Sequence, residues 1–343
     1  MIDGRSKPAT IHQVAAHAGV SIATVSRALS GSTTVASATR ERVLAAVEEL
    51  RFRPSRLGQS LAEGRHAANG IVFPDLSGPY YAEVVLGYEE VAAELGSSVL
   101  ILATHGRPDP SRRVLELARR VDGMVLMGRT VPDDVVAQLT ETGIPVVLLA
   151  RPAVGGPDAV HEPDTVNVDN EHGTRALVEH LLGHGYQRFA FVGDPGESPD
   201  VASRYAAFRT CLLGAGRRPP RDPLRCDFDV SSGRRTALRA LRRALRPEVL
   251  VCGNDETALG ALEAAAELGL SVPGDVAITG WDDVMAARYA GLTTVRQPIR
   301  ELGATAARWL QERIAGGLMP VRRQVLQTQL VVRSSCGTHD HQK

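Results

Sequence analysis

From Asn69 onward, short apolar runs alternate with helical stretches, and this alternation constrains the fold more than any other feature of the sequence. The segment Tyr81–Leu95 is one of the helical stretches that separate the runs. Strands that alternate with helices form parallel sheets covered on both sides, so such strands are apolar throughout. We therefore expect an α/β body whose strands, buried on both faces, are GIVFPD, SVLILAT, VDGMVLM, IPVVLLA, RFAFVG, VLVCG and VAITGWDD.

The body lacks the motifs of the common α/β enzymes. No Walker A sequence, no G-x-G-x-x-G fingerprint and no nucleophile elbow follows any of the apolar runs. We therefore expect a protein that is not an enzyme and that needs no cofactor and no metal ion.

Charge is distributed unevenly along the 343 residues, a length that suits two or three domains of about 150 residues each. The formal net charge is zero, but residues 1–66 hold nine Lys and Arg against five Asp and Glu, and the remainder holds 30 against 34. A basic head on an acidic body is expected when one end binds a polyanion, although a small basic domain can also be merely solvated.

Neither secretion nor disulfide bonding is indicated. Met1–Arg5 lacks the apolar core of a signal peptide, and no apolar run is long enough to span a membrane. The cysteines are scattered without a C-x-x-C pair, which indicates reduced thiols rather than a zinc site or a disulfide framework. We expect a cytoplasmic protein that makes no membrane contact, with four free thiols at Cys211, Cys226, Cys252 and Cys336.

The start of the chain carries the signals of two short helices joined by a tight turn. Thr10 can cap the first helix, and Gln13 completes a capping box. Gly19 is expected to end that helix, because glycine adopts the left-handed backbone conformation of a helix C-terminus without steric cost. Ser21 caps a second helix, from about Ile22 to Leu29. The two helices are short enough, and their residues small enough, to cross closely.

A third helix is expected to begin near Ser37 or Thr39 and to run through RERVLAAVEELRF. Three short helices with a tight turn between the first two describe a helix-turn-helix, although the spacing alone also fits a small bundle docked on a larger domain. We expect Ala15, Val20, Val25 and Ala28 to form the seam of the first two helices, and Val43, Leu44, Val47 and Leu50 to cover it.

The stretch TIHQVAAHAGVSIATVSRALSG resembles the headpiece of LacI/GalR-family transcription regulators. The family pattern is T-I-x-D-V-A-x-x-A-G-V-S-x-x-T-V-S-R, and the chain matches nearly every fixed position, with Gln13 in place of the usual Asp. The resemblance implies that Ile22, Ala23 and Arg27 face base edges in the major groove, and that Thr24 and Ser26 contact phosphates. Arg27 can donate two hydrogen bonds to O6 and N7 of guanine. The DNA-binding residues implied by the resemblance are Thr10, Ser21, Ile22, Ala23, Thr24, Ser26, Arg27, Arg56 and Leu61.

The stretch RPSRLGQSLAEGR, residues 53–65, resembles the hinge helix of the same family, which folds against its dimer mate on DNA. Pro54 ends the preceding helix, and Ser55 can cap a short new one. Leu61 occupies the place of the leucine that wedges into the minor groove at the operator centre. Gly58, where the family prefers alanine, lowers helix propensity by about 1 kcal/mol, so we expect this segment to fold only on DNA.

The resemblance continues to LVVRSS at Leu330–Ser335 and implies a periplasmic-binding-protein-like core of two parallel-sheet lobes. The lobes would be connected by crossings near Val166, Thr294 and Gln324. The implied domains are a headpiece at 1–54, a hinge and linker at 55–67, and an effector-binding and dimerisation domain at 68–343, with an N-lobe at about 68–166 plus 295–323 and a C-lobe at about 167–293 plus 324–335.

Polar residues follow several of the expected strands, where ligands of open α/β sheets bind. Each one alone could merely cap a helix, as Asn254 could for the helix that starts at Asp255. Their joint match to the family's effector-contact positions implies a pocket of aromatic rings, carboxylates, an amide and guanidinium groups, which suits a sugar-like ligand; a flat purine is the main competitor. The expected effector-binding residues are Asp75, Tyr80, Tyr81, Arg151, Asp169, Arg204, Phe228, Asn254 and Asp282.

These observations predict a sequence-specific transcription regulator, a repressor, that is controlled by a small effector. It would bind near-palindromic double-stranded operator DNA as a homodimer, with one helix-turn-helix for each half-site. The alternative is a solute-binding protein of a sugar transport system, which shares the core fold but not the headpiece. The sequence does not indicate the effector, the operator, or whether the effector releases or promotes DNA binding.

Overall fold

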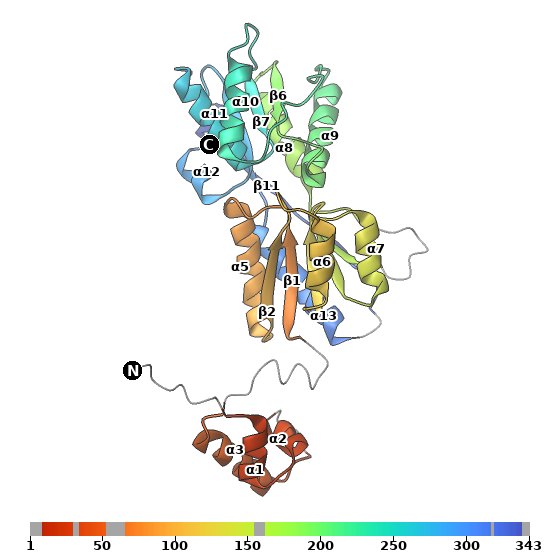
Figure 1. Ribbon diagram of the computed structural model, residues 1–343. Coiled ribbons are helices and arrows are strands. Elements are labelled where there is room, and N and C mark those ends of the chain that lie inside the picture. Colours follow the sequence, from red (N-terminus) through yellow and green to blue (C-terminus); the bar gives the residue numbers. More distant parts are fainter. Residues whose placement is uncertain (1–8, 30–33, 53–65, 154–161, 317–318, 338–343) are drawn as a thin grey trace, which may run out of the picture. The chain divides into compact units, whose positions relative to one another are not determined.

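The computed structural model describes residues 9–29, 34–52, 66–153, 162–316 and 319–337. The chain divides into two compact units, Met1–Ala67 and Ala68–Lys343, which are described separately (Figure 1). Arg56 and Leu61, together with the expected hinge segment around them, lie outside the described residues.

The described residues of the first unit form three helices, α1 (Ile11–Ala18), α2 (Ile22–Leu29) and α3 (Ser37–Glu49). The predicted capping box is present, because the Thr10 side chain accepts from the Gln13 backbone and the Thr10 N–H donates to Gln13 Oε1 at 2.8 Å. Gly19 ends α1 in the left-handed conformation, and the Ser21 Oγ accepts from the Thr24 N–H at 3.2 Å. Local side-chain chemistry therefore sets the turn between α1 and α2.

The core of this unit is small and aliphatic. On α3, the buried and partly buried residues Val43, Ala46, Val47 and Leu50 follow i, i+3, i+4, i+7 spacing. Leu44 is one position outside this stripe and is 49% exposed, so the expectation that it covers the first two helices is wrong. The remaining buried members of the core are Val14, Ala15, Ala18, Val25 and Ala28.

The second unit begins with a six-stranded parallel sheet, which with its helices is called the first lobe. Its strand order is β10-β5-β4-β3-β1-β2. The strands are β1 (Ala68–Phe73), β2 (Ser98–Ala103), β3 (Gly123–Met127), β4 (Val146–Leu149), β5 (Asp164–Val168) and β10 (Arg323–Leu326).

Helices cover both faces of this sheet. One core contains α5 (Pro79–Glu94) and α13 (Ile299–Ala315), and the opposite core contains α6 (Pro110–Ala118) and α7 (Asp133–Glu141). Alternate residues of one strand enter opposite cores, as Val125 and Leu126 do. The strand at the edge, β2, departs from the expected burial on both faces, since its Ile101 is 45% exposed.

The second lobe is built on a five-stranded sheet of order β11-β9-β8-β7-β6, in which only the β11–β9 pair is antiparallel. Its strands are β6 (Phe189–Val192), β7 (Val249–Cys252), β8 (Ala277–Asp282), β9 (Thr293–Arg296) and β11 (Gln329–Val331). One core holds α8 (Asn170–Gly183) and α9 (Pro199–Gly214), and the other holds α10 (Val230–Leu241), α11 (Asp255–Glu267) and α12 (Met285–Tyr289). A short 3-10 helix, η1 (Ser334–Cys336), follows β11. Two lobes of this kind confirm the predicted α/β class.

The chain passes between the lobes three times, after β5, after β9 and after β10. The expected crossings near Val166, Thr294 and Gln324 each fall two residues before the end of the strand, which is at Val168, Arg296 and Leu326. The apolar pattern does not mark these ends, because each of the three segments mixes apolar and polar residues up to the crossing.

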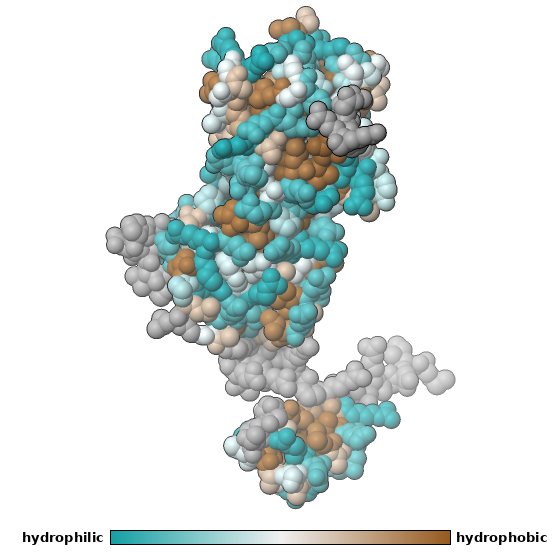
Figure 2. Space-filling view, turned by 180° about the vertical axis from the view of Figure 1, so that it is seen from behind, coloured by the Kyte–Doolittle hydropathy of each residue, from teal (hydrophilic) through white to brown (hydrophobic). Residues whose placement is uncertain are grey.

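On the face shown in Figure 2, the surface of the second unit is mostly hydrophilic, with apolar residues in separate areas. Among the described residues, no helix combines the length and the apolar character needed to cross a membrane.

Candidate functional site

A cavity of about 470 Å³ is lined by residues of both lobes, and we call it the interlobe cavity. The sequence predicts nine effector-binding residues, and the structure brings seven of them to this one cavity. These seven are Asp75, Tyr80, Tyr81, Arg204, Phe228, Asn254 and Asp282.

The cavity forms where the carboxyl ends of parallel strands meet, as expected for open α/β sheets. In the first lobe, Asp75 follows β1 and Thr104 follows β2. In the second lobe, Asn254 follows β7 and Asp282 is the last residue of β8. Residues far apart in the sequence therefore reach one space, because the parallel strands within each sheet end at the same edge.

Arg204, on α9, is held on several sides within the second lobe and is only 5% exposed. Its Nε donates to Asn170 Oδ1 and its Nη1 donates to the Gly253 carbonyl, both at 2.8 Å. Its Cζ lies 4.2 Å from the centre of the Trp281 ring, and Nη2 lies 3.8 Å from Asp200 Oδ2. A guanidinium has five N–H donors, so this fixed group still has donors for a bound ligand.

Two carboxyl groups of the cavity are buried near Arg204. Burial raises the pKa of Asp282 well above its usual range, although the charge of Arg204 opposes this, and Gln297 Nε2 donates to Asp282 Oδ1. Burial also raises the pKa of Asp200, against the opposing effects of Arg204 and Asn170. Carboxyl groups with raised pKa values are more readily protonated than exposed ones, and so can both donate to and accept from ligand hydroxyls.

The backbone at Asp282 is in an uncommon conformation, with φ at 116°, and Asp283 follows with φ at 59°. Such conformations persist where the surrounding structure fixes them, and they are frequent at ligand sites. The positive φ values turn the chain at the end of β8, where Asp282 lines the cavity.

Aromatic rings reach the cavity from both lobes. Tyr80 and Tyr81 lie in the first turn of α5 and pack edge to face, with ring centres 5.3 Å apart. Phe228 lines the cavity from the second lobe. Burial raises the pKa values of both tyrosines, so their hydroxyls stay neutral and can donate hydrogen bonds.

Asn254 serves two purposes at once. Its Oδ1 accepts from the Thr257 N–H at 3.0 Å and caps α11, which is the helix-capping role that the sequence leaves open. Its Nδ2 donates to the Phe228 carbonyl at 3.0 Å, and the residue also lines the cavity. Asn254 thereby fixes the backbone that carries Phe228.

Arg151 and Asp169, the other two expected effector-binding residues, are not among the residues that line the cavity. Arg151 is buried, donates to the Val131 carbonyl at 2.9 Å and pairs with Asp133. Asp169 caps α8, since its Oδ1 accepts from the His172 N–H at 2.9 Å. Both follow strands of the first lobe as expected, but their side chains are used within the protein.

The sequence reasoning missed much of the acidic lining. Several of the missed residues lie in loops or in the first turn of a helix rather than directly after a strand. Among the described residues, seven carboxyl residues line the cavity, together with the basic residues Arg129, Arg204 and His105. The acidic set is Asp75, Glu197, Asp200, Asp227, Asp229, Glu256 and Asp282; other polar residues that were not predicted include Ser77, Thr104, Thr130, Ser198 and Gln297.

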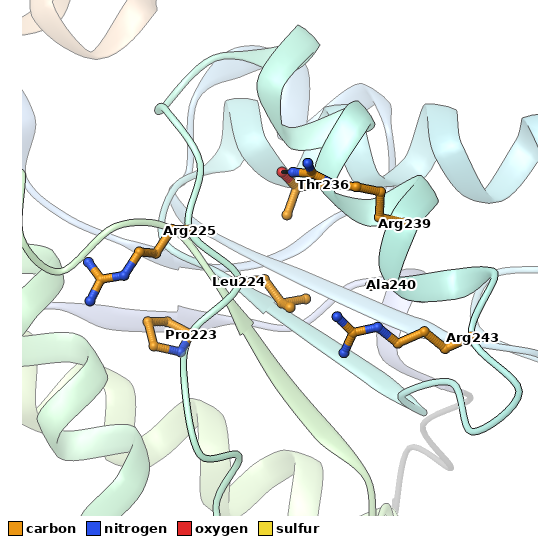
Figure 3. Close-up of a pocket in the computed structure, with 7 residues that line it drawn as sticks. All are labelled: Pro223, Leu224, Arg225, Thr236, Arg239, Ala240 and Arg243. Carbon is orange, nitrogen blue, oxygen red and sulfur yellow. Dashed lines mark hydrogen bonds between the residues drawn. The ribbon is translucent and has the colours of Figure 1, made fainter.

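A second cavity, of about 340 Å³, lies in the second lobe and contains none of the expected residues (Figure 3). Two of its three arginines already have partners, because Arg225 pairs with Asp194 and Arg239 donates to Thr236 Oγ1 at 3.1 Å. It is lined by Pro223, Leu224, Arg225, Thr236, Arg239, Ala240 and Arg243. The interlobe cavity is therefore the better candidate for the effector site.

The expected DNA-reading residues lie on the exposed side of α2. Ile22, Ala23 and Arg27 are exposed, whereas Val25 and Ala28 of the same helix are buried in the core. The Arg27 Nε donates to the Ala23 carbonyl at 3.2 Å.

The remaining expected DNA contacts among the described residues are hydroxyl side chains. Thr24 and Ser26 are partly buried, and Thr10 and Ser21 cap the two helices. Ser21 Oγ also lies 2.9 Å from Thr24 Oγ1. Hydroxyls at helix N-termini lie beside the positive ends of the helix dipoles, where a phosphate binds favourably.

Two family models match the chain. The model for bacterial regulatory proteins of the lacI family matches residues 10–55, and the model for a periplasmic binding protein-like domain matches residues 178–336. Among curated relatives, catabolite control protein A of Priestia megaterium is 31% identical over 88% of this chain and 91% of its own length.

Solved structures of similar fold support the same family. The Lac repressor dimer bound to operator and the anti-inducer ONPF is 29% identical, covers 97% of this chain and 100% of its own, and gives a TM-score of 0.84. The complex of the transcriptional regulator CelR with cellobiose is 32% identical, covers 95% of this chain and 99% of its own, and gives a TM-score of 0.70.

Proposed function

The chain belongs to the lacI family of bacterial regulatory proteins, which are DNA-binding transcription regulators and not enzymes, and we propose that it is a repressor controlled by a sugar or a sugar-like polyol. A regulator of this kind acts on chromosomal DNA, and we place it in the cytoplasm.

The proposed DNA contacts are made by the first unit. The exposed side of α2, with Ile22, Ala23 and Arg27, would enter the major groove, and Thr24 and Ser26 would contact phosphates. The Lac repressor structure is a dimer, and we propose that this chain likewise binds a near-palindromic operator as a homodimer.

The single observation that carries the effector proposal is the composition of the interlobe cavity. Tyr80 and Tyr81 from one lobe and Phe228 from the other supply apolar faces, and Asp282 and Arg204 supply buried hydrogen-bonding groups beside them. Sugar rings have an apolar face and hydroxyls around the edge, so this arrangement suits them. The structure of CelR with cellobiose supports the same class of ligand.

Charge narrows the class of ligand further. Seven carboxyl residues line the cavity against two arginines and one histidine, so a phosphorylated sugar or a nucleotide would meet more negative than positive charge. A neutral sugar avoids that repulsion. A purine base can stack on the same rings, but it has few hydroxyls for the buried carboxyl groups.

We propose that effector binding draws the two lobes together, because the proposed contacts come from both lobes. A ligand shifts a conformational equilibrium only by its differential affinity for the two states. Contacts made at once to Tyr81 and Asp282 supply such a difference, since the two residues belong to different lobes.

The test begins with thermal melts of the full chain in the presence of neutral sugars, sugar phosphates and purines. An effector present at 100 times its Kd raises the free energy of unfolding by about 2.7 kcal/mol. The compounds that stabilise the protein are then titrated onto its complex with labelled operator DNA. We expect a neutral sugar to change operator affinity, and a response to purines alone would contradict the proposal.

A variant then assigns the site. Asp282→Ala removes a buried carboxyl group of the cavity, and we expect it to abolish the response to the effector while operator affinity is kept. The matched control is Asp222→Asn, because Asp222 is highly exposed and does not line the cavity. An Asp282→Ala protein whose response has an unchanged midpoint would remove this residue from the site.

A further inference from the structure

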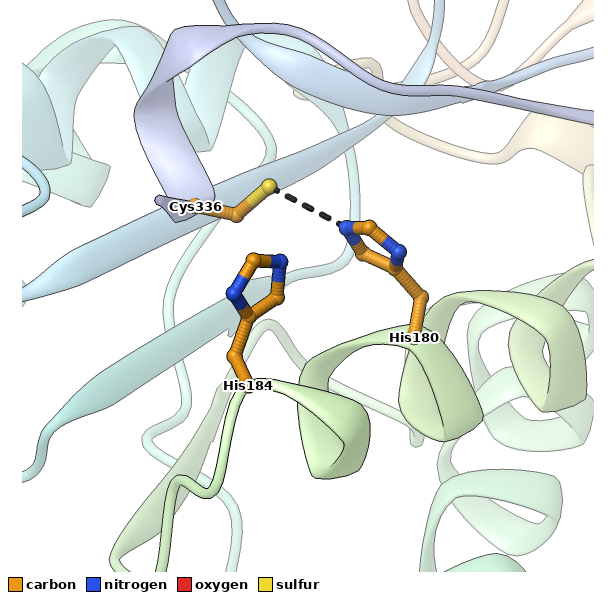
Figure 4. Close-up of side chains that lie close together, drawn as sticks. All are labelled: His180, His184 and Cys336. Atoms are coloured by element: carbon orange, nitrogen blue, oxygen red, sulfur yellow. Dashed lines mark hydrogen bonds between the residues drawn. The ribbon is translucent and has the colours of Figure 1, made fainter. Parts of the chain in front are cut away.

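Two histidines and a cysteine converge in the second lobe, outside the interlobe cavity (Figure 4). His180 lies in the last turn of α8, and His184 is the residue that caps the same helix. Residues four apart lie on the same face of a helix, so both rings lie on one side. Cys336, in η1, brings its thiol to this side from the far end of the chain.

The three side chains are spaced as metal ligands are. His180 Nε2 lies 3.4 Å from Cys336 Sγ, and the three potential ligand atoms all lie within 4.8 Å of one another. In a tetrahedral zinc site, bonds of about 2.0–2.1 Å to nitrogen and about 2.3 Å to sulfur place N and S about 3.5 Å apart. The His180–Cys336 pair already has this spacing, and a ligand atom of His184 lies within 4.8 Å of both.

The thiol is held firmly in this position. Cys336 is fully buried, and its Sγ lies 2.9 Å from Thr293 Oγ1 on β9. Its carbonyl accepts from the Tyr186 hydroxyl at 3.0 Å. The preceding Ser335 is fixed as well, because its Oγ accepts from the Thr293 N–H at 2.8 Å.

The backbone after the cysteine also passes very close to the second histidine. A Cβ atom at Gly337 would lie 3.0 Å from the His184 ring, tighter than ordinary packing. Glycine therefore lets the chain run beside the imidazole, and the position of His184 is defined from that side too.

We propose that His180, His184 and Cys336 bind a divalent transition metal ion, with zinc as the natural occupant. One thiolate and two imidazoles form a borderline-soft donor set, which suits zinc and cobalt and disfavours magnesium and calcium. In the part of the chain that the structure describes, no further His, Cys, Asp or Glu joins this group, so a solvent molecule completes the tetrahedron.

The ion would fasten the C-terminal segment to the body of the second lobe. Cys336 follows β11 and the two histidines end α8, so the metal would join elements that are 156 residues apart in sequence. Its role would be structural, since the protein is not an enzyme and the cluster is separate from the interlobe cavity. The sequence alone gives no sign of this cluster, because its residues come together only in the fold.

The experiment uses the full chain, reduced and stripped of metal by a chelator. Cobalt(II) is titrated first, because a cobalt–thiolate bond gives a charge-transfer band and tetrahedral cobalt absorbs strongly in the visible. We expect one cobalt ion per chain, displacement of cobalt by zinc, and a rise of the thermal midpoint with zinc. Absence of the thiolate band at equimolar cobalt overturns the proposal.

Variants then locate the ion. Cys336→Ser should abolish the thiolate band, and His184→Gln should weaken cobalt binding by more than the roughly 10- to 100-fold that loss of an outer-shell partner costs. His184 is partly exposed, so this second variant keeps the test valid if Cys336→Ser does not fold. Circular dichroism and operator binding of each variant verify that it is folded.

Two controls exclude other ligands. Cys211→Ser removes a partly buried thiol outside the cluster, and it should leave the band unchanged. A His339→Ala/His341→Ala double variant removes the two histidines that follow in the sequence CGTHDHQK, and it should also leave the band unchanged. Persistence of the band in Cys336→Ser, or its loss in either control, overturns the assignment.

Discussion

The carboxylate of Glu256, in the second lobe, lies so close to Gly78 of the first lobe that a Cβ atom at position 78 would overlap it. Gly78 precedes α5 with φ at 95°, and Glu256 lies in the first turn of α11 and lines the interlobe cavity. The contact spans the cavity from one lobe to the other. A side chain at position 78 would have to displace the flexible end of Glu256, and the φ of 95° would strain any residue other than glycine there.

Titration of the Glu256 carboxylate should make the stability of the folded protein depend on pH. Burial, with the nearby charges of Asp229 and Asp75, raises the pKa of Glu256 from 4.5 to about 7. A raised pKa means that the folded state favours the protonated form, so the stabilisation is complete below about pH 4.5 and is lost as the pH rises through about 7. We expect the thermal midpoint of wild type, relative to that of Glu256→Gln, to fall across this range and to level off above it.

Melts of both proteins from pH 4.5 to pH 8 test this expectation. Glu263→Gln is the matched control, because Glu263 is an exposed carboxylate on the same helix. A constant difference between wild type and Glu256→Gln across the range would show that the Glu256 carboxyl does not titrate there.

Arg204 is predicted to stabilise the second lobe as well as to bind the effector. Its guanidinium lies 3.8 Å from the Asp200 carboxylate, its charge acts on the buried Asp282, and it donates to Asn170 and to the Gly253 carbonyl. Removing one partner of a buried charge pair typically costs about 3–5 kcal/mol, so we expect a loss of that order for Arg204→Ala in denaturant unfolding at pH 7. Arg204→Lys keeps the charge but not the planar fork of hydrogen-bond donors, so its stability should lie between those of the wild type and Arg204→Ala.

The sequence was most informative where local chemistry decides the structure. The bounds of the first two helices follow from the caps at Thr10 and Ser21 and from the turn at Gly19. The alternation of apolar runs with helical stretches predicts the parallel sheets of the two lobes. Strand ends located the cavity because every parallel strand of a sheet ends at the same edge.

The sequence was least informative where side-chain direction or long-range proximity decides. Arg151 and Asp169 follow strands as expected, but their side chains pair and cap within the first lobe and at α8. Glu256 reaches the cavity from a helix turn, which no strand-end rule identifies. His180 and Cys336 became neighbours only through the fold, since their separation in the sequence gives no spacing signal.

A buried ion-pair cluster in the first lobe gives a further stability prediction. The carboxylate of Asp164 on β5 is fully buried and accepts from Arg313 at 2.7 Å and from Arg322 at 2.8 Å. Burial acts to raise the pKa of Asp164, but the hydrogen bonds from the two arginines lower it overall. A lowered pKa contributes stability that is present above about pH 3.8 and is lost as the pH falls further.

We therefore expect Asp164→Asn to destabilise the protein by about 3–5 kcal/mol at pH 7, and by less as the pH falls below about 3.8, because the unfolded wild type then binds a proton that the folded carboxylate does not. Denaturant unfolding of both proteins at several pH values measures this, with the exposed Asp222→Asn as control. An equal loss at all pH values would mean that packing, and not charge, is what the substitution removes.

Arg27 is predicted to read a guanine, because it is exposed on α2 and belongs to the stretch that matches the family headpiece. Bidentate donation to guanine O6 and N7 contributes about 1–3 kcal/mol of discrimination, so Arg27→Ala should lose about that much for each half-site and relax the preference at one base pair. Arg42, exposed on α3, provides the matched control: if Arg42→Ala affects binding, it should do so uniformly across sequences and lower the salt dependence by about one phosphate contact. Selection of binding sites from random DNA, followed by titration at fixed salt, distinguishes the two patterns. An Arg27→Ala protein that weakens binding but keeps the full base preference would make Arg27 a phosphate contact and would require another residue of α2 to read the base.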